Sequence, residues 1–543
     1  MNYKFKKHEN IGQPAAEMDD QFLSKCFFDN GDLSVLLDTE DPRMIVLGRT
    51  GSGKSAILLE VKRKHPKNTF VLNPEALSVE HVATNEMITF FEDLGVRLDV
   101  FYKLLWKHVI VLEVIKLCFE ITNEDKKQGW IQRYLMPLKR DKKKQKSIKY
   151  LEDWSNKFWD DSEYRIKEIT QNFDKDLRAG AAAALGQGTF SLEAGISSST
   201  EIKADIIKRG KQVVNSLQMK DLDGVVSILA EDLLTNDQKK FYLTIDKLDE
   251  DWVGDDIKYK LIKALFEALK DLSCIKNVKI LVSMRRDLMD YVFKNTRGAG
   301  HQQEKYDSLC LNLQWSETEL EKLLDARINE LIQRRYTKKK ITLAELLPKK
   351  IERNQPSIRY LMDRTFLRPR DAITFMNYCI AKCIDHSKFT ATCFRQAEKD
   401  YSEDRFKSLS DEWQLQYPNL RNICSILENR PSKFFFTNIK EDDILDAVCN
   451  YPTDDKGELN QACSNYIADT NVDRFLQTFF SVLYRVGLIG IKSKGSQEVQ
   501  WSYRHSPVLS ASELEKDTKI YIHKTFWAAL GVKQPNTGSA GSE

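Results

Sequence analysis

Short apolar runs separated by long stretches of helical periodicity dominate the pattern of hydrophobic and polar positions. A run that is apolar throughout is typical of a strand buried on both faces, whereas apolar residues three or four apart, as in Ala56–Lys64, are typical of a helix. The predicted strands are Met44–Leu47, Thr69–Leu72, Phe241–Ile245, Val278–Met284 and Ser308–Trp315. Strands that alternate with helices indicate an α/β fold with a parallel sheet, in a chain that is mostly α overall.

The second and third predicted strands are separated by about 165 residues, far more than one crossover connection needs. Most of this stretch has helical periodicity and predicts a large helical insert at about 75–235. Within it, the basic run at 138–149 is either a solvated surface or a nucleic-acid contact. The small residues of 179–200 suggest either a projecting hairpin that contacts a partner or another subunit, or a flexible insertion.

Two helices with clear start signals follow the last strand. Ser316 and Glu319 have the spacing of a capping box, which predicts a helix that runs to about Gln333. Pro369 suits the first turn of a second helix. These helices predict a lid after the α/β domain. The expected divisions are an N-terminal segment (1–40), the α/β domain (41–315), the helical lid (316–400), a C-terminal module (401–530) and a flexible tail (531–543).

The C-terminal module combines predicted helices with a hairpin. Its elements are helices at Leu420–Asn429, Ile439–Asn450 and Val472–Arg485, and strands at Leu488–Ile491 and Val499–Arg504. Three helices followed by a hairpin indicate a winged helix. Large apolar residues outnumber Arg474, Gln477 and Arg485 in the third helix, so we expect this module to pack on protein. Lys492 and Lys494 in the wing keep DNA as an alternative partner.

A glycine-rich stretch after the first predicted strand carries the strongest chemical signal. Gly48–Ser55 satisfies the pattern G-x-x-x-x-G-K-[ST], with the strand before it and the helix after it that a phosphate-binding loop requires. Glycines let backbone N–H groups approach a phosphate closely, at the positive end of a helix dipole. Lys54 is expected to bind the β- and γ-phosphates, and Ser55 to bind Mg²⁺. The predicted nucleotide-binding residues here are Gly48, Arg49, Thr50, Gly51, Ser52, Gly53, Lys54 and Ser55.

Acidic residues after the third predicted strand are candidates for a metal ligand and a catalytic base. Asp246 follows the buried run directly, where a carboxylate would bind Mg²⁺ through water; an acidic helix cap is the alternative. Many ATPases with such a phosphate-binding loop have a glutamate directly after this aspartate, but this chain has Lys247 there. We therefore expect the base to be Glu250, with Asp249 as the second choice.

The strand at Val278–Met284 ends in two polar side chains, Ser283 and Arg285, and resembles the position that holds a sensor of the γ-phosphate in P-loop ATPases with an additional strand, which makes both residues candidate sensors. Ligands bind at the carboxyl edge of a parallel sheet, which is where these side chains are expected. An arginine after a strand is also common as a solvated residue, which is the alternative for Arg285.

Together these residues resemble the AAA+ and STAND group of P-loop ATPases, in the division with an additional strand between the phosphate-loop strand and the acidic strand. The resemblance rests on Gly48–Ser55, Asp246–Trp252, Arg285–Asp287, the helix led by Trp315, and Arg368–Asp371. It implies a P-loop NTPase fold, bound ATP and Mg²⁺, a homo-oligomer and a partner effector, in a role such as antiphage defence. It also implies that Arg370 or Arg368 in the lid contacts the γ-phosphate; pairing of Arg370 with Asp363 or Asp371 is the alternative.

Composition limits the possible partners and compartments. The chain of 543 residues has 83 basic and 80 acidic side chains, so its net charge of +3 provides no general attraction to nucleic acid or anionic lipid. Its longest apolar segment is interrupted by charges, and the N-terminus lacks a signal-peptide core, so we expect a cytoplasmic protein outside the membrane. The ten cysteines lack metal-finger spacing and suit a reduced compartment. Cys379 and Cys383 are expected in a helix core, with a metal site that includes His386 and Cys393 as the alternative.

The leading functional hypothesis is a molecular switch that binds Mg·ATP, closes its lid, assembles, and is reset by hydrolysis. Two alternatives stay open. One is a DNA-engaging ATPase that uses the winged helix and the basic runs. The other is a non-hydrolysing scaffold stabilised by nucleotide, which Lys247 in place of a glutamate suggests.

Overall fold

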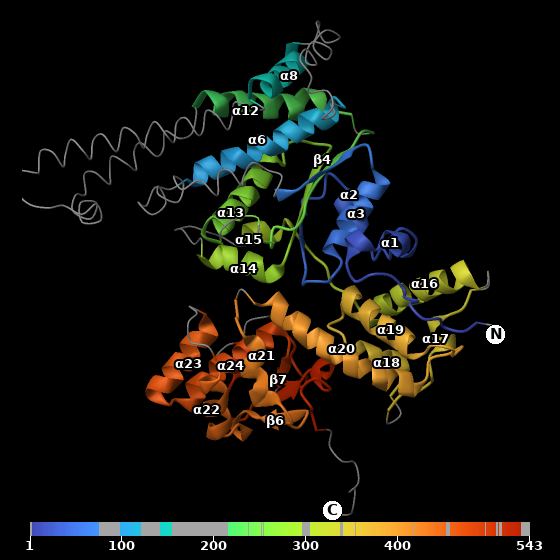
Figure 1. Ribbon diagram of the computed structural model, residues 1–543. Helices are drawn as coiled ribbons and strands as arrows, with labels where there is room; N and C mark the ends of the chain where they lie inside the picture. Colours follow the sequence, from blue (N-terminus) through green and yellow to red (C-terminus); the bar gives the residue numbers. More distant parts are fainter. Residues whose placement is uncertain are drawn as a thin grey trace, which may run out of the picture. The chain divides into compact units, whose positions relative to one another are not determined.

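The computed structural model describes residues 3–74, 98–120, 142–154, 216–236, 238–250, 252, 255–295, 304–336, 340–352, 355–414, 416–451, 457–494, 496–505, 509 and 513–533 (Figure 1). The chain forms two compact units. Unit 1 consists of Met1–Phe28, Thr50–Gly53 and Gln314–Glu543, and unit 2 consists of Asp29–Arg49 and Lys54–Leu313. None of the described helices combines enough length with enough apolar residues to span a lipid bilayer.

Unit 2 is built on a five-stranded parallel sheet, which confirms the predicted α/β class. Its strands are β1 (Ile45–Leu47), β2 (Thr69–Leu72), β3 (Phe241–Ile245), β4 (Val278–Met284) and β5 (Cys310–Asn312). Their order is β2-β3-β4-β1-β5, so β4 lies between β1 and β3. β3 and β1 are buried throughout, because both faces of the sheet are covered. β5 is shorter than the predicted run at 308–315.

Helices cover both faces of this sheet. Their bounds are α2 (Asp32–Leu37), α3 (Lys54–Lys64), α6 (Asp99–Cys118), α8 (Lys142–Trp154), α12 (Ser216–Ile228), the π-helical turn η6 (Leu229–Leu233), α13 (Asp255–Leu272), α14 (Arg286–Asn295) and α15 (Glu304–Asp307). Figure 1 shows α2 and α3 on one side of β4, and α6, α13 and α14 on the other. Right-handed crossover connections explain why the helices lie on two faces. The connection from β1 to β2 crosses the sheet in one direction and the later connections cross it in the other, so their helices cover opposite faces.

The predicted helical insert is helical where the structure describes it. Most residues of α6 are buried; the helix packs along α13, and Trp106 Nε1 donates a hydrogen bond of 2.9 Å to the Leu261 carbonyl. The basic run at 138–149 lies partly in α8, and its first residues lie outside the described part of the chain. The predicted hairpin at 179–200 also lies outside the described residues.

Unit 1 begins with an N-terminal segment that packs on the first lid helices. Its helices up to the C-terminal module are η1 (Ala16–Met18), α1 (Asp20–Cys26), α16 (Glu317–Arg335), α17 (Leu343–Leu346), α18 (Ser357–Met362), α19 (Pro369–Lys382) and α20 (Ala391–Glu412). The predicted capping box is present: Ser316 Oγ accepts from the Glu319 N–H, and the Glu319 carboxylate accepts from the Ser316 N–H at 2.7 Å. Pro369 is the first residue of α19, as predicted.

The C-terminal module of unit 1 contains an antiparallel sheet of order β6-β8-β7. Its elements are α21 (Leu420–Ile423), η7 (Cys424–Leu427), β6 (Lys433–Phe435), η8 (Phe436–Asn438), α22 (Glu441–Cys449), α23 (Glu458–Asp469), α24 (Val472–Val486), β7 (Ile489–Lys492), β8 (Lys519–Ile522) and η10 (Lys524–Phe526). The predicted helices at Ile439–Asn450 and Val472–Arg485 correspond to α22 and α24. β6 and α23 were not predicted.

The predicted second strand of the hairpin is wrong. Val499–Arg504 contributes one isolated bridge, between Gln500 and Ile491, and then turns. The strand that pairs with β7 is β8, whose Ile520 and Ile522 are buried in the module's core. β8 therefore buries apolar side chains in the core when it pairs with β7. Residues 499–504 would not do so in the register of the Gln500–Ile491 bridge.

Candidate functional site

The glycine-rich stretch lies between a strand and a helix. β1 ends at Leu47 and α3 begins at Lys54. Gly51 and Gly53 have φ angles of +79° and +100°, a conformation that residues with a side chain rarely adopt. Two left-handed glycines therefore build the turn immediately before the helix N-terminus, where backbone N–H groups lack helical partners.

Lys54 folds back over the start of the loop. Its Nζ donates to the carbonyl oxygens of Gly48 and Arg49, each at 3.2 Å. A hydrogen bond from an ammonium group to a charged oxygen is stronger than one to a neutral carbonyl. A phosphate oxygen within reach can therefore replace these carbonyls as the acceptor.

Asp246 and Ser283 lie together at the carboxyl edge of the sheet. Ile245, the last residue of β3, pairs with Val282 of β4, so the next residues of the two strands are neighbours. Ser283 Oγ donates to Asp246 Oδ1. Asp246 Oδ1 also accepts from the Lys247 N–H at 2.9 Å. The structure thus brings together two predicted site residues, and Ser283 positions the Asp246 carboxylate.

The two candidate bases lie in the turn that follows Asp246. Lys247 has a φ of +65°, and its ammonium group pairs with the Glu250 carboxylate at 3.4 Å, with about half of each side chain exposed. Asp249 is partly exposed in the same turn. The buried Trp252 fixes the turn by donating from Nε1 to the Leu248 carbonyl at 3.0 Å. The roles of Glu250 and Asp249 stay predictions.

Arg285 lies between β4 and α14 and pairs with a residue of that helix. Its Nε and Nη2 donate to the two carboxylate oxygens of Asp287 at 3.1 and 2.6 Å, at the first turn of α14. This bidentate pair holds a guanidinium group that is mostly shielded from solvent. Of the two predicted sensors, Ser283 is therefore the one that contacts Asp246.

In unit 1, three successive carbonyl groups of the glycine-rich loop accept hydrogen bonds from Trp315, just before the lid, and from Arg368 and Arg370 at the start of α19. The bonds run from Arg368 Nη1 to Thr50 O (2.7 Å), from Arg370 N to Gly51 O (3.3 Å) and from Trp315 Nε1 to Ser52 O (2.8 Å). A Cβ at Gly51 would lie 2.7 Å from the Arg370 Cβ, so the close approach also needs glycine. The Arg-Pro-Arg-Asp motif thus contacts the loop backbone directly.

Arg368 belongs to a buried ion-pair network. Its Nε donates to Asp371 Oδ2 at 2.8 Å, Glu412 lies 3.6 Å away, and Arg405 pairs with the other Asp371 oxygen at 3.3 Å. Burial alone would raise the pKa of Asp371, but the Arg368 and Arg405 guanidiniums outweigh burial and hold that pKa well below its usual range. Because the Arg368 guanidinium is held by these carboxylates, its position is fixed, and so is its hydrogen bond to the Thr50 carbonyl.

Arg370 has different surroundings. Its side chain lies against Gly51, and its Nε donates to the Pro14 carbonyl at 3.4 Å. Burial and the Arg368 guanidinium lower the pKa of Arg370. The alternative partners considered for it are engaged elsewhere, since Asp371 pairs with Arg368 and Arg405, and Asp363 pairs with Arg359 and Lys524. Arg370 is therefore the better placed of the two lid arginines to meet a ligand.

Two buried hydroxyl groups in the loop also suit a phosphate ligand. The hydroxyl oxygens of Thr50 and Ser52 are buried and have no hydrogen-bond partner among the described residues. Buried hydroxyl groups are normally satisfied, so two such groups in one glycine-rich loop are suited to an additional acceptor such as phosphate. Ser55 and Asp246 are hard oxygen donors of the kind that Mg²⁺ prefers when phosphates complete its coordination.

Sequence reasoning missed the contribution of the N-terminal segment. Ile11 N donates to Asn377 Oδ1, and Asn377 Nδ2 donates to the Gly12 carbonyl, each at 2.9 Å. Arg327 pairs with Asp19 at 2.6 Å, with both side chains 3% exposed. These bonds join residues more than 300 positions apart and have no local sequence signal. They fix the chain just before Pro14, whose carbonyl Arg370 contacts.

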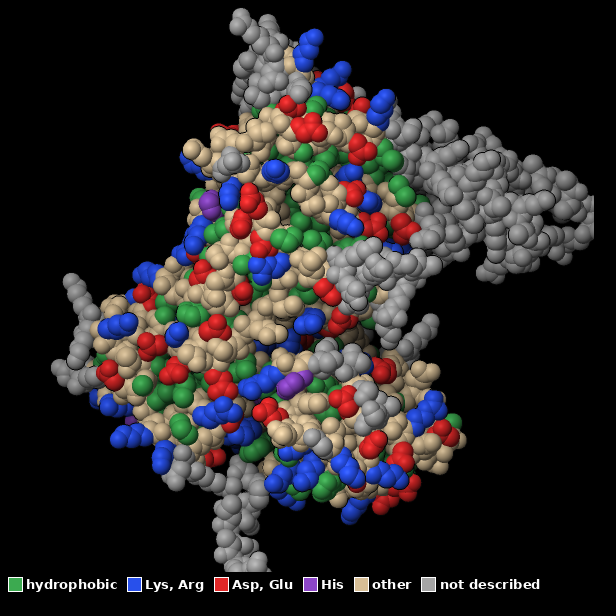
Figure 2. Space-filling view, turned by 180° about the vertical axis from the view of Figure 1, so that it is seen from behind, with side chains coloured by type: hydrophobic (Ala, Val, Ile, Leu, Met, Phe, Trp, Pro, Cys, Tyr) green, Lys and Arg blue, Asp and Glu red, His purple; other side chains and the backbone are tan. Residues whose placement is uncertain are grey.

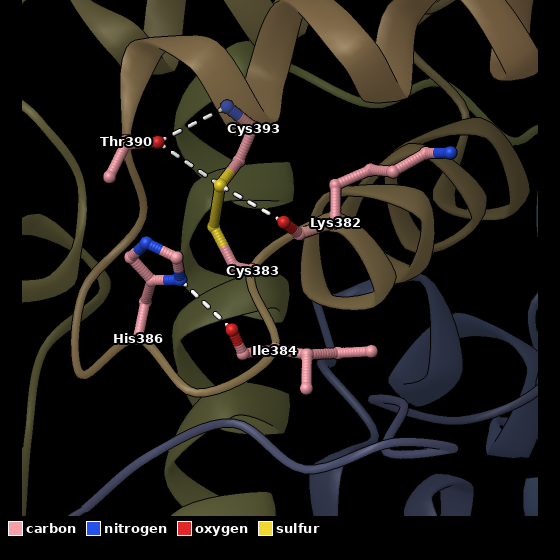
Figure 3. The surroundings of a disulfide bond; sticks show 6 residues. All are labelled: Lys382, Cys383, Ile384, His386, Thr390 and Cys393. Carbon is pink, nitrogen blue, oxygen red and sulfur yellow. Dashed lines mark hydrogen bonds between the residues drawn. A yellow bond between two sulfur atoms is a disulfide. The ribbon is translucent and has the colours of Figure 1, made fainter.

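The expectation that the cysteines are unpaired is wrong for one pair. Cys383, after α19, and Cys393, in the first turn of α20, form a disulfide with a Cα–Cα distance of 5.7 Å (Figure 3). Thr390 caps α20 by accepting from the Cys393 N–H at 3.2 Å, which presents the sulfur toward Cys383. Cys379 is fully buried in the helix core, as predicted. His386 Nδ1 lies 2.9 Å from the Ile384 carbonyl.

No metal site of protein ligands alone is present in the described part of the chain, where no three His, Cys, Asp or Glu side chains gather to hold an ion. Two of the four candidate ligands in the alternative metal site, Cys383 and Cys393, are joined to each other in the disulfide. A Mg²⁺ site that needs one carboxylate, one hydroxyl and the oxygens of a bound phosphate stays open.

Two comparisons with known proteins find similarity. Residues 318–410, from α16 to α20, match the family model described as the FunZ-associated C-terminal helical domain. A curated protein of Escherichia coli (strain K12), the "Putative transposon gamma-delta 80.3 kDa protein", is 20% identical over 547 aligned residues, which cover 97% of this chain and 68% of that protein. Neither description names a nucleotide, so these similarities say nothing about whether the glycine-rich loop binds one.

Proposed function

We propose that this protein is a P-loop ATPase of the additional-strand division that works as a molecular switch. The observation that carries the proposal is the glycine-rich loop: Gly48–Ser55 has the full phosphate-loop pattern, two left-handed glycines and the start of α3 at Lys54. The strand order supports it, because β4 separates β1 from β3, whose end carries Asp246.

Each residue has a proposed task. Lys54 transfers its hydrogen bonds from the Gly48 and Arg49 carbonyls to phosphate oxygens. Ser55 and Asp246 would hold Mg²⁺, and Ser283 orients the Asp246 carboxylate. Bound Mg·ATP supplies the phosphoanhydride bond that is cleaved and the charge that the metal partly neutralises. Glu250, or Asp249, would accept the proton of the attacking water.

The lid would respond to nucleotide through Arg370. Its backbone and side chain contact Gly51, so a change in the loop reaches α19 directly. Closure would then favour assembly with other copies of the chain and contact with a partner effector.

A DNA-engaging ATPase is the second candidate function. The order of elements in the C-terminal module, in which β8 joins β6 to β7 after α24, is that of a winged helix, and the name of the Escherichia coli protein connects it with a transposon. α24 offers little for base reading, because Arg474 pairs with Asp469 and Arg485 pairs with Glu458. We therefore rank this candidate below the switch.

Phosphate release from Mg·ATP tests the proposal. Wild-type protein, Lys54→Ala and the matched control Lys62→Ala, an exposed lysine on the same helix α3, are compared across protein concentrations, with and without duplex DNA. We expect turnover that Lys54→Ala lowers at least 100-fold and Lys62→Ala leaves unchanged, since an electrostatic contact to the transferred phosphoryl group contributes about 3 kcal/mol or more. Turnover that rises with protein concentration supports the assembling switch, and turnover that rises with DNA supports the second candidate. Equal release by wild type and Lys54→Ala would reject hydrolysis and leave the nucleotide-stabilised scaffold.

A further inference from the structure

The outer face of the C-terminal sheet carries basic and aromatic side chains in alternation. In each strand, residues alternate between the buried core and the outer face. Phe434, Ile520 and Ile491 point into the core, and their neighbours along the strands therefore point outward. The outward positions are Lys433, Phe435, Lys519, Tyr521, Gly490 and Lys492.

The strand register arranges these positions in two rows. Phe435 pairs with Lys519, and Lys519 pairs with Lys492, so one row crosses all three strands. Phe435 is 42% exposed, and the Lys519 Nζ lies 5.1 Å from the centre of its ring. An exposed phenylalanine beside two lysines is unusual on a surface that serves only solubility.

In the second row, Lys433 pairs with Tyr521, and Tyr521 pairs with Gly490. A Cβ at Gly490 would lie 2.8 Å from the Trp501 ring, so glycine at this position lets the indole lie flat against the outer face of the sheet. Tyr521 and Trp501 are both partly exposed. Each row therefore combines at least one aromatic ring with at least one lysine.

None of the six outward positions on these strands carries a carboxylate. Figure 2 shows Lys and Arg intermixed with Asp and Glu over most of the face that it draws. Asp517, two residues before β8, is engaged at the edge of the sheet, where it pairs with Lys494 at 3.3 Å. The sheet face is thus locally basic in a protein of net charge +3.

We propose that this sheet face binds single-stranded nucleic acid, with Phe435, Tyr521 and Trp501 stacking on unpaired bases and Lys433, Lys492 and Lys519 contacting the phosphates. Exposed rings stack on bases only where the bases are unpaired, which selects single strands over duplex. The phosphates of the strand supply the negative charge that matches the lysines. An acidic protein segment would match the charge but would leave the three rings without a stacking partner. The proposal goes beyond the ATPase function and does not depend on it.

Fluorescence anisotropy of labelled 20-nucleotide oligo(dT), oligo(rU) and a 20-base-pair duplex with the full-length protein tests this. We expect both single strands to bind at least tenfold more tightly than the duplex. With three lysines on the phosphates, the logarithm of the affinity should fall with the logarithm of the salt concentration with a slope of about −2. Lys54→Ala should bind equally well, which separates this proposal from that of ATP hydrolysis.

Variants with matched controls locate the site. Phe435→Ala should weaken single-strand binding about tenfold by removing one stacking ring, and Lys519→Gln should weaken it and flatten the salt dependence. Lys494→Gln, which removes the same charge from an exposed lysine paired outside the two rows, should bind like wild type. Unchanged melting temperatures would show that the variants fold. The proposal is overturned if no strand binds, if the duplex binds as tightly, if polyglutamate of equal length competes as well as oligo(dT), or if Lys494→Gln loses as much affinity as Lys519→Gln.

Discussion

His108 on α6 is 1% exposed, and its Nδ1 lies 2.8 Å from the Tyr150 hydroxyl of α8. Burial, helped by the nearby Lys116 ammonium, lowers the pKa of His108 to about 3. The folded protein therefore keeps this imidazole neutral down to acidic pH, whereas the unfolded chain binds a proton below about pH 6.5. A base whose folded pKa is depressed makes the folded state less stable as pH falls from about 6.5 toward 3.

This single group is expected to cost about 2 kcal/mol of stability between pH 7 and pH 5. We predict that the fall in Tm between these pH values is smaller in His108→Gln than in wild type. Tyr150→Phe keeps the buried imidazole and should retain the wild-type pH dependence even if its Tm is lower at both values. The same pH dependence in wild type and His108→Gln would show that His108 does not contribute to it.

Several contacts of the candidate site could not be predicted from residues that are neighbours in the sequence. The partner of Trp315 is the Ser52 carbonyl, which lies 263 positions away along the chain. Asp371 was predicted only as a surface partner, and it is instead fully buried between Arg368 and Arg405. Sequence can suggest the i,i+3 pairing of Arg368 and Asp371, but burial depends on α20, which supplies Arg405 and Glu412 from a later part of the chain.

Among the elements, those with strong local signals were predictable. β1 to β4 and helices α16, α19 and α24 begin close to where apolar runs, a capping box or a proline place them. β6 and β8 were missed because each is a short strand, and its pairing depends on residues far along the chain: Lys433 pairs with Tyr521. The disulfide was missed for a similar reason, since Cys383 and Cys393 meet only when α19 and α20 pack together.

The start of α19 is the element that we expect to connect stability with nucleotide response. Arg368→Gln leaves the buried Asp371 with one fewer cation and removes the bond to the Thr50 carbonyl. We predict a loss of stability of about 3–5 kcal/mol, measured as a lower Tm, together with weaker Mg·ATP turnover.

Arg370→Gln should behave differently, because its guanidinium lies against the loop and forms no ion pair with any of the described residues. We expect Tm close to that of wild type and a clear loss of ATP-dependent turnover. Arg395→Gln, an exposed position on α20, is the matched control and should change neither quantity. Normal turnover in Arg370→Gln would remove Arg370 from the proposed site.

At the scale of the whole molecule, unit 2 is an α/β unit that carries Lys54 and Asp246, and unit 1 is a largely helical unit in which Arg368 and Trp315 donate to the carbonyls of Thr50 and Ser52. The α/β class and the parallel sheet were predictable from the alternation of strands and helices. The sequence did not predict that Thr50–Gly53 belong to unit 1 while the residues on either side belong to unit 2. This assignment depends on contacts of the loop with the lid and not on any pattern in the loop.

The central claim is that Gly48–Ser55 binds the phosphates of ATP. Isothermal titration of Mg·ATP into wild-type protein, Lys54→Ala and Lys62→Ala measures this without requiring hydrolysis. We predict a single saturable site in wild type, the same affinity in Lys62→Ala, and an affinity at least tenfold weaker in Lys54→Ala, because the lysine provides a charge-assisted bond to phosphate. Absence of binding in wild type, or equal affinity in Lys54→Ala, would contradict the claim.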